Sequence, residues 1–126
     1  MKQTARQGAS EKGAKLYLDA LAHHREGSLQ KAKKLYEAAL KISPDLASAW
    51  NNLGAIYMKE RNYSAALRAL QRALRIKPND ADPYYNLACV YTLQKDIAQG
   101  LSYLKKAVSV DGEARNWAMT DADLKN

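Results

Sequence analysis

The chain repeats itself every 34 residues, and this period constrains its fold more than any other feature of the sequence. When the sequence is shifted against itself by 34 residues, three segments align without a gap. The aligned sets are Leu16, Trp50 and Tyr84; Asp19, Leu53 and Leu87; Ala20, Gly54 and Ala88; His23, Tyr57 and Tyr91; Ala32, Ala66 and Gly100; Tyr36, Leu70 and Leu104; and Ala39, Ala73 and Ala107. Small residues let two helices approach and large residues fill the space between them, so the pattern predicts stacked helix pairs.

Each copy holds two helical patterns on either side of a short polar break. Ser28, Asn62 and Asp96 follow the three breaks, and each is a good N-cap for the helix that comes next. Pro44 and Pro78 end the second helix of the first two copies, because proline lacks the amide hydrogen that a helix interior needs. The predicted helices cover residues 10–25, 29–42, 47–60, 63–76, 82–94 and 97–110.

The middle copy carries a known motif. Its residues fit the pattern W-x2-L-G-x2-Y, A-x3-F and P, with leucine in place of the phenylalanine. They are Trp50, Leu53, Gly54, Tyr57, Ala66, Leu70 and Pro78. The chain therefore resembles the tetratricopeptide repeat (TPR) family over about residues 13–114. The resemblance implies an all-α fold, a right-handed superhelical solenoid of three helix-turn-helix pairs. The repeat region is predicted for residues 10–112, and the 34-residue period divides it into copies at about 13–46, 47–80 and 81–114.

The two ends are less regular than the repeats. Residues 1–9 are polar and are predicted to form an N-terminal arm. Residues 113–126 are predicted to begin a partial C-terminal capping helix, in which Trp117 and Met119 cover the last repeat. Thr120 and Asp123 resemble the start of a further helix just before the sequence stops, so we interpret the chain as cut from a longer protein.

Composition limits the compartment and the class of partner. No apolar run approaches the ~20 residues of a membrane-spanning helix, and the first residues do not resemble a secretory signal. Cys89 is the only cysteine, which excludes an internal disulfide and fits a reducing, cytoplasmic location. The net charge is +7, with the excess in the first two thirds of the chain. This charge favours anionic partners.

The sequence offers no catalytic or cofactor-binding motif. His23 and His24 are adjacent, and adjacent helical residues do not share a face, so they do not form a metal site. His23 aligns with two tyrosines of the other copies, which favours a packing role. No glycine-rich phosphate loop or nucleophile elbow occurs. We therefore expect no cofactor, no metal and no enzymatic activity from this chain alone.

Basic residues also line the second helices. Arg68, Arg72 and Arg75 follow an i, i+4, i+7 spacing, and Lys34 aligns with Arg68. The resemblance places these helices on the convex outside of the solenoid, where a basic ribbon could meet an anionic surface or nucleic acid. Aromatic residues do not interleave with the ribbon, so nucleic-acid binding is not favoured.

The same resemblance implies a concave groove, lined by the first helix of each pair, in which family members bind peptides. By alignment the predicted groove residues are Tyr17, Leu18, Leu21, His24, Arg25, Asn51, Asn52, Ala55, Met58, Lys59, Tyr85, Asn86, Cys89, Thr92 and Leu93. Arg25 and Lys59 favour an acidic or phosphorylated partner. The positions of the carboxylate clamp of chaperone-binding TPRs fall on Tyr17, Leu21, Asn52, Asp82 and Asn86, and only Asn52 matches. Asn52 and Asn86 instead resemble two rungs of the asparagine ladder of O-linked N-acetylglucosamine transferases.

The sequence therefore predicts a protein-interaction module that binds a protein or peptide segment in its concave groove. One alternative is the substrate-recruiting TPR arm of a larger transferase. A second alternative is a nucleic-acid or anionic-surface binder that uses the convex ribbon. Pairing of two copies through uncapped ends of the solenoid also stays open.

Overall fold

The computed structural model describes the backbone of residues 2–122 and the side chains of residue 8 and residues 10–112. This part of the chain holds six helices and no strand. The helices are α1 (Lys2–Arg25), α2 (Leu29–Ile42), α3 (Ala47–Lys59), α4 (Tyr63–Ile76), α5 (Ala81–Leu93) and α6 (Ile97–Ala122). The bounds of α2 and α4 are those that the sequence predicts, α3 ends one residue earlier, and α5 begins and ends one residue earlier.

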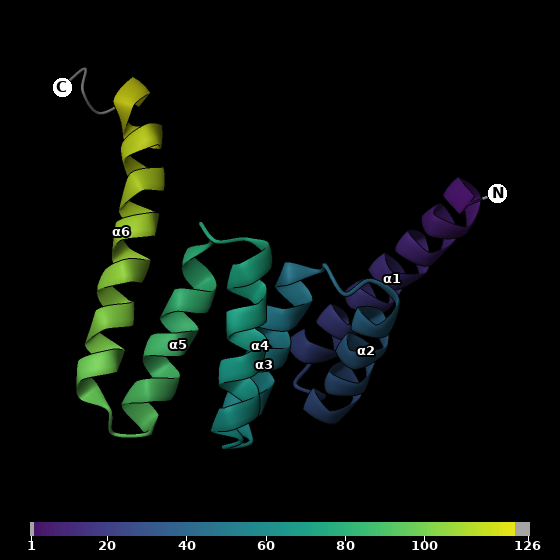
Figure 1. Ribbon diagram of the computed structural model, residues 1–126, viewed down its shortest axis with the longest axis horizontal. Coiled ribbons are helices and arrows are strands. Elements are labelled where there is room, and N and C mark those ends of the chain that lie inside the picture. The colour runs from purple at the N-terminus through teal and green to yellow at the C-terminus, as the bar shows by residue number, and fades with distance from the viewer. Residues whose placement is uncertain (1, 123–126) are drawn as a thin grey trace.

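The helices pack as three antiparallel pairs that stack along the chain (Figure 1). Each pair consists of consecutive helices, α1 with α2, α3 with α4 and α5 with α6. The stack continues through contacts of α2 with α3 and of α4 with α5, and the first helices α3 and α5 also touch. The prediction of an all-α helical solenoid is therefore confirmed.

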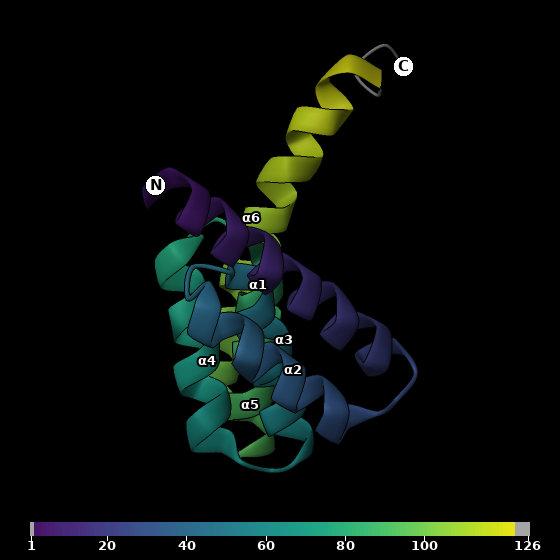
Figure 2. The same cartoon turned by 90° about the vertical axis from the view of Figure 1, so that its right-hand side faces the viewer.

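Both ends of the stack differ from the sequence-based prediction. α1 begins at Lys2, so the residues expected to form a polar arm are helical. α6 continues to Ala122, so residues 113–122 extend the last helix and do not begin a separate capping helix. The repeat position that holds a proline in the first two copies is Gly112 here, and glycine retains the amide hydrogen that proline lacks. The first turns of α1 (Figure 1) and the C-terminal part of α6 (Figure 2) project beyond the packed pairs. Trp117 and Met119 lie outside the described side chains.

The turn inside each pair uses a left-handed backbone conformation at the same repeat position. Gly27, Arg61 and Lys95 have φ angles of 85°, 62° and 67°. This conformation closes the first helix of the pair: the amide of the next residue bonds back to the carbonyl of Tyr57 in the second repeat and of Tyr91 in the third. Glycine adopts this region without strain, whereas arginine and lysine do so at a cost.

N-capping follows the prediction in two of three repeats. The Asn62 side chain accepts a hydrogen bond from the Ala65 amide at 3.4 Å, and Asp96 accepts one from the Gln99 amide at 3.2 Å. Ser28 occupies the predicted N-cap position, but its side chain makes no capping hydrogen bond. The Leu29 amide bonds instead to the carbonyl of Gly27 at 3.0 Å.

Close approach of the paired helices depends on small residues. A Cβ atom placed on Gly54 would lie 2.8 Å from Cγ of Leu70 and 3.4 Å from the carbonyl oxygen of Ala66. Leu70 is fully buried, as is Ala66. The glycine of the repeat motif is therefore explained by the contact between α3 and α4, where any side chain would push the two helices apart.

Candidate partner-binding groove

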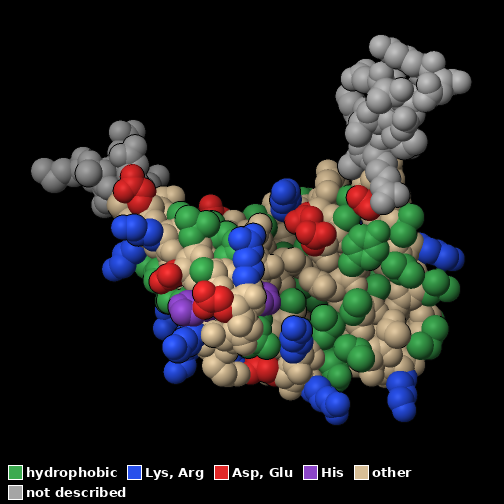
Figure 3. Space-filling model, turned by 180° about the vertical axis from the view of Figure 1, so that it is seen from behind, with side chains coloured by type: hydrophobic (Ala, Val, Ile, Leu, Met, Phe, Trp, Pro, Cys, Tyr) green, Lys and Arg blue, Asp and Glu red, His purple; other side chains and the backbone are tan. Residues whose placement is uncertain are grey.

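The predicted groove residues lie on α1, α3 and α5, the first helices of the three pairs. Figure 3 shows the side of the molecule opposite to that of Figure 1, where hydrophobic side chains gather toward the C-terminal end of the stack. Along these helices Arg25, Lys59 and Cys89 are exposed, and Leu18 is 61% exposed. Tyr17, Leu21, Ala55, Met58 and Tyr85 are half-buried.

A buried tyrosine organises the N-terminal part of this surface. Tyr36, from α2, is fully buried, and its hydroxyl lies 3.0 Å from Nδ1 of His24. The ring of Tyr17 packs against it at a centroid distance of 6.0 Å. Burial raises the pKa of Tyr36 to about 12, and a hydrogen bond with the Asn52 side chain opposes that rise. His24 and Asn52 thus interact with the hydroxyl of Tyr36, and Tyr17 packs against its ring. The sequence-based alignment did not include Tyr36 in the groove.

The two adjacent histidines have different surroundings. Burial, and after it the positive charge of Lys59, lower the pKa of His24. His23 is half-buried, and its Nδ1 lies 4.0 Å from Oε2 of Glu26, beyond hydrogen-bond distance. Among the described residues no group of three or more histidine, cysteine and acidic side chains is placed to hold a metal ion.

Two of the three asparagines of the groove are hydrogen-bonded to each other. Nδ2 of Asn86 donates a hydrogen bond to Oδ1 of Asn51 at 2.9 Å, which joins α5 to α3. The side chain of Asn52, the repeat equivalent of Asn86, interacts with the hydroxyl of Tyr36. Each amide has both donor and acceptor atoms, so one such bond leaves further capacity for a peptide.

An apolar hollow of about 580 Å³ forms the C-terminal end of this surface. We call it the terminal hollow. It is lined by Met58, Tyr85, Ala88, Cys89, Thr92, Leu93, Ile97, Gly100, Leu101 and Leu104. Five of these are predicted groove residues from α3 and α5. The other five were not predicted, and four of those lie on α6.

The hollow is open because no described helix covers α6. Ile97, Leu101 and Leu104 are 61%, 50% and 41% exposed. Their equivalents one repeat earlier are Tyr63, Leu67 and Leu70, which pack against α5, and Leu70 is fully buried there. The sequence held a signal for this site: the i, i+4, i+7, i+11 spacing of apolar residues at Ile97, Leu101, Leu104 and Val108 marks a face that needs a covering helix.

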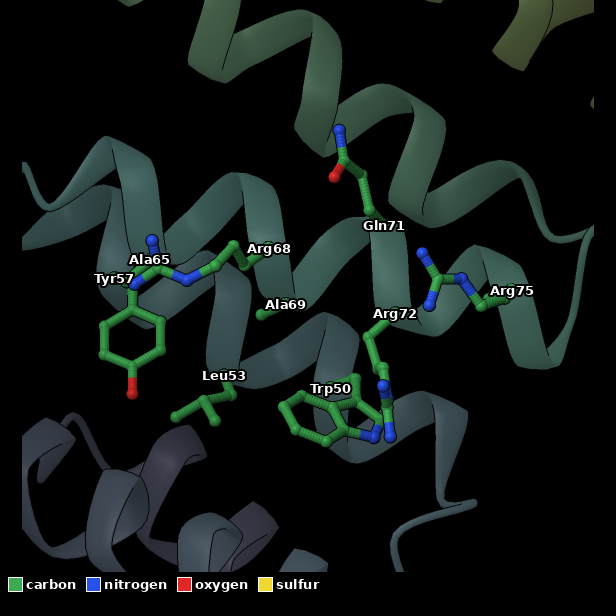
Figure 4. Close-up of a pocket in the computed structure, with 9 residues that line it drawn as sticks. All are labelled: Trp50, Leu53, Tyr57, Ala65, Arg68, Ala69, Gln71, Arg72 and Arg75. Atoms are coloured by element: carbon green, nitrogen blue, oxygen red, sulfur yellow. The ribbon is translucent and has the colours of Figure 1, made fainter.

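A second hollow lies between residues of α3 and α4, and none of the predicted groove residues lines it. We call it the outer notch. It has a volume of about 420 Å³ and is lined by Trp50, Leu53, Tyr57, Ala65, Arg68, Ala69, Gln71, Arg72 and Arg75. Figure 4 shows Leu53 between the rings of Trp50 and Tyr57, with Arg68 above Tyr57 and Arg72 beside the indole. All three arginines of the predicted convex ribbon therefore border this one hollow.

Comparison with protein families identifies the repeats. Models described as "Tetratricopeptide repeat" match residues 47–80 and 69–101, and one described as "TPR repeat" matches residues 20–60. The chain belongs to the tetratricopeptide repeat family. The match begins in α1 and ends in α6, and it includes most of the predicted groove.

Similar proteins support this family and fold. The chain is 39% identical over 49 residues to the tetratricopeptide repeat domain-containing protein PYG7, chloroplastic, of Arabidopsis thaliana, a match that covers 39% of this chain and 16% of that protein. The structure of MamA is similar with a TM-score of 0.77 at 20% identity over 85% of this chain and 63% of that one. The TPR2B domain of yeast Sti1, in a complex with pHsp70, has a TM-score of 0.79 at 22% identity over 88% of this chain and 89% of that one.

The described helices contain no segment long and apolar enough to cross a membrane.

Proposed function

We propose that this chain is a protein-interaction module whose concave groove takes up an amphipathic helical segment of a partner protein. The observation that carries the proposal is the terminal hollow, where Ile97, Leu101 and Leu104 expose between 41% and 61% of their surface. Apolar side chains gathered in one hollow gain free energy when a partner covers them. Two similar structures are of complexes by their titles, CopN-Scc3 and TPR2B with pHsp70, which supports a protein partner.

The chain itself indicates what kind of segment covers such a face. In the first repeat the equivalent surface of α2 is covered by Trp50, Leu53, Ile56 and Tyr57 of α3. In the second repeat the surface of α4 is covered by Tyr84, Leu87, Val90 and Tyr91 of α5. Both covering helices carry the same pattern: an aromatic residue, then a leucine three positions after it, a β-branched residue six positions after it and a tyrosine seven positions after it. A partner helix with this spacing fits the terminal hollow.

The polar part of the groove continues from the hollow along α5 and α3. The free donor and acceptor capacity of Asn52 and Asn86 can bind the backbone of a non-helical extension of the same segment. The exposed side chains of Arg25 and Lys59 favour acidic or phosphorylated residues in that extension. A cytoplasmic location stays a prediction from the single free cysteine.

A peptide taken from this chain tests the proposal. A labelled peptide with the sequence of residues 81–94 and the change Cys89→Ser carries the covering pattern, and its binding is measured by fluorescence anisotropy. We expect saturable binding that Leu101→Glu abolishes, because a carboxylate in an apolar contact is costly to desolvate. Ile76→Glu is the matched control, since Ile76 is exposed on α4 and outside the hollow.

Equal binding by the two variants, or no binding to the parent protein, would contradict the proposal. Sedimentation at increasing protein concentration tests whether two copies of the chain pair through the terminal hollow. If the parent protein forms dimers and Leu101→Glu makes it monomeric, then the terminal hollow is an interface between two copies, and the proposed partner helix is wrong.

A further inference from the structure

The outer notch lies beside a small, buried residue of the second repeat, Ala69. Ala69 lines the notch, and the equivalent residues of the other repeats are Leu35 and Tyr103, which pack against the buried clusters. Tyr103 stacks on Tyr84 and Tyr91 with centroid distances of 6.4 and 5.5 Å, and these are the equivalents of the two aromatic residues in the notch. The third repeat thus has a large ring at the position where the second repeat has a small side chain.

Positive charge surrounds the same opening. Arg68 and Arg75 are exposed on α4, and within the described part of the chain neither forms an ion pair. Their equivalents in the third repeat are Ser102 and Ser109. The open notch and the two unpaired guanidinium groups therefore occur together in one repeat, whereas the third repeat has neither.

Among the described residues, no acidic side chain forms an ion pair with an arginine of the notch. Glu37 and Glu60 act electrostatically on Tyr57 at one end of the notch. Oε2 of Glu60 already binds Nζ of Lys33 at 2.8 Å and Nε2 of Gln30 at the same distance. The guanidinium groups of Arg68 and Arg75 are left to bind carboxylates from outside the chain.

From this combination we infer that the outer notch is a second binding site, which takes an acidic peptide segment of a partner protein. An aliphatic side chain of that segment occupies the hollow beside the half-buried rings of Trp50 and Tyr57, and flanking carboxylates pair with Arg68 and Arg75. Guanidinium groups pair with carboxylates through two parallel hydrogen bonds. The site is therefore expected to prefer a peptide with acidic side chains to an anionic surface that offers no such paired acceptors.

Nucleic acid fits the site less well. Binding of a single strand uses open aromatic faces on which bases stack. The Trp50 ring packs against the first buried cluster, carries the Arg72 guanidinium 5.7 Å from its centroid, and donates its Nε1–H to the Pro44 carbonyl at 2.8 Å. An apolar floor between charged groups instead suits a peptide in which aliphatic and acidic residues are neighbours.

The test uses a fluorescein-labelled, end-capped peptide in which Glu-Asp pairs alternate with leucine. We expect the double variant Arg68→Gln, Arg75→Gln to weaken its binding by about tenfold, the effect of losing two charge-assisted contacts. The control is Lys34→Gln, Lys41→Gln, which removes the same charge from the equivalent positions of the first repeat and is expected to change affinity by less than about twofold. Circular dichroism checks that both variants stay helical.

Two further measurements separate the notch from charge alone. Ala69→Leu places in the notch the side chain found at the equivalent position of the first repeat, keeps all three arginines, and is expected to weaken binding by about tenfold because the leucine of the peptide loses its place. Leu101→Glu, in the terminal hollow, is expected to leave this binding unchanged.

Several results would overturn the inference. Equal loss in the arginine and lysine doubles would show diffuse electrostatic attraction, and full affinity in Ala69→Leu would show that the notch is not used. Equal affinity for a peptide with glutamine and asparagine in place of the acids would remove the role of the arginines. If duplex DNA displaces the peptide at equimolar concentration, the surface binds nucleic acid and the peptide site is wrong.

Discussion

The guanidinium of Arg72, on α4, lies over the indole ring of Trp50, on α3, at 5.7 Å from the ring centroid. One repeat later the ammonium of Lys106 lies over the ring of Tyr84 at 5.9 Å. Both aromatic residues also donate a hydrogen bond to the carbonyl of the proline six positions earlier, Trp50 at 2.8 Å and Tyr84 at 3.3 Å. The aromatic residue that opens the repeat motif thus ties the preceding turn to the second helix of its own pair.

Removing the charge of Arg72 should destabilise the protein slightly. Arg72→Met keeps most of the aliphatic stem and deletes the cation, and we expect a loss of ~0.5 to 1 kcal/mol in the free energy of unfolding, which is typical of an exposed cation–π contact. Urea denaturation measures it. Gln71→Met, on the neighbouring exposed position, is the control, and an equal loss there would exclude a specific contact with Trp50.

Arginine and lysine in the left-handed turns should be replaceable by glycine with a gain in stability. Arg61 and Lys95 have φ angles of 62° and 67°, at the position where the first repeat has Gly27. We expect Arg61→Gly and Lys95→Gly each to raise the free energy of unfolding by ~1 kcal/mol, because the strain of a side chain in this region is removed. Thermal melts check the result, and a fall in melting temperature in both variants would contradict it.

Enlarging Gly54 should cost stability although alanine is the better helix former. A Cβ there would lie 2.8 and 2.9 Å from Cγ and Cδ2 of Leu70, so α3 and α4 must separate or Leu70 must move. We expect Gly54→Ala to lose ~1 to 3 kcal/mol in chemical denaturation. Gly8→Ala is the control, since nothing lies within 4 Å of its Cβ position and helix propensity alone predicts a gain of ~1 kcal/mol.

The hydrogen bond between Asn86 and Asn51 should appear as a coupling energy between α5 and α3. Single changes to alanine at either position are each expected to lower the free energy of unfolding by ~0.5 to 1.5 kcal/mol. Because both remove the same bond, the double variant should lose less than the sum of the two. Fully additive losses in a double-mutant cycle would mean that the bond at 2.9 Å contributes nothing to stability.

Stability should fall as the pH is lowered through the range in which His24 titrates. Burial and Lys59 lower the pKa of His24 in the folded state, so below the unfolded value of 6.5 the unfolded chain takes up a proton more readily than the folded one. The stabilising contribution is therefore complete above that pH and is lost below it. We expect His24→Gln to show a smaller difference in stability between pH 7.5 and pH 5.5 than the parent protein. His23 is present in both proteins, so it does not contribute to the difference between them. Equal differences would exclude this role for His24.

The sequence by itself determined the helix pairs and their order. Residues that repeat every 34 positions, such as Trp50 and Tyr84, report contacts within a pair and between neighbouring pairs, and these contacts are local enough to leave a periodic pattern. Pro44 and Pro78 ended α2 and α4 near the predicted residues, because a proline acts on the backbone of its own segment. The groove residues could be assigned to helices on the same grounds.

Only the tertiary structure decided which surfaces are open. Leu70 and Leu104 occupy the same repeat position, yet one is fully buried and the other is 41% exposed, because a helix packs over the first and none of the described helices covers the second. Ala69 lines the outer notch, whereas Tyr103 at the equivalent position packs against the second buried cluster, and Arg68 and Arg75 border the notch. Periodicity states which residues share a face of a helix. Burial, cavity shape and hydrogen-bond partners depend on which side chains of the neighbouring helices pack against that face. Those side chains come from distant parts of the chain and reach the face only after the pairs have stacked.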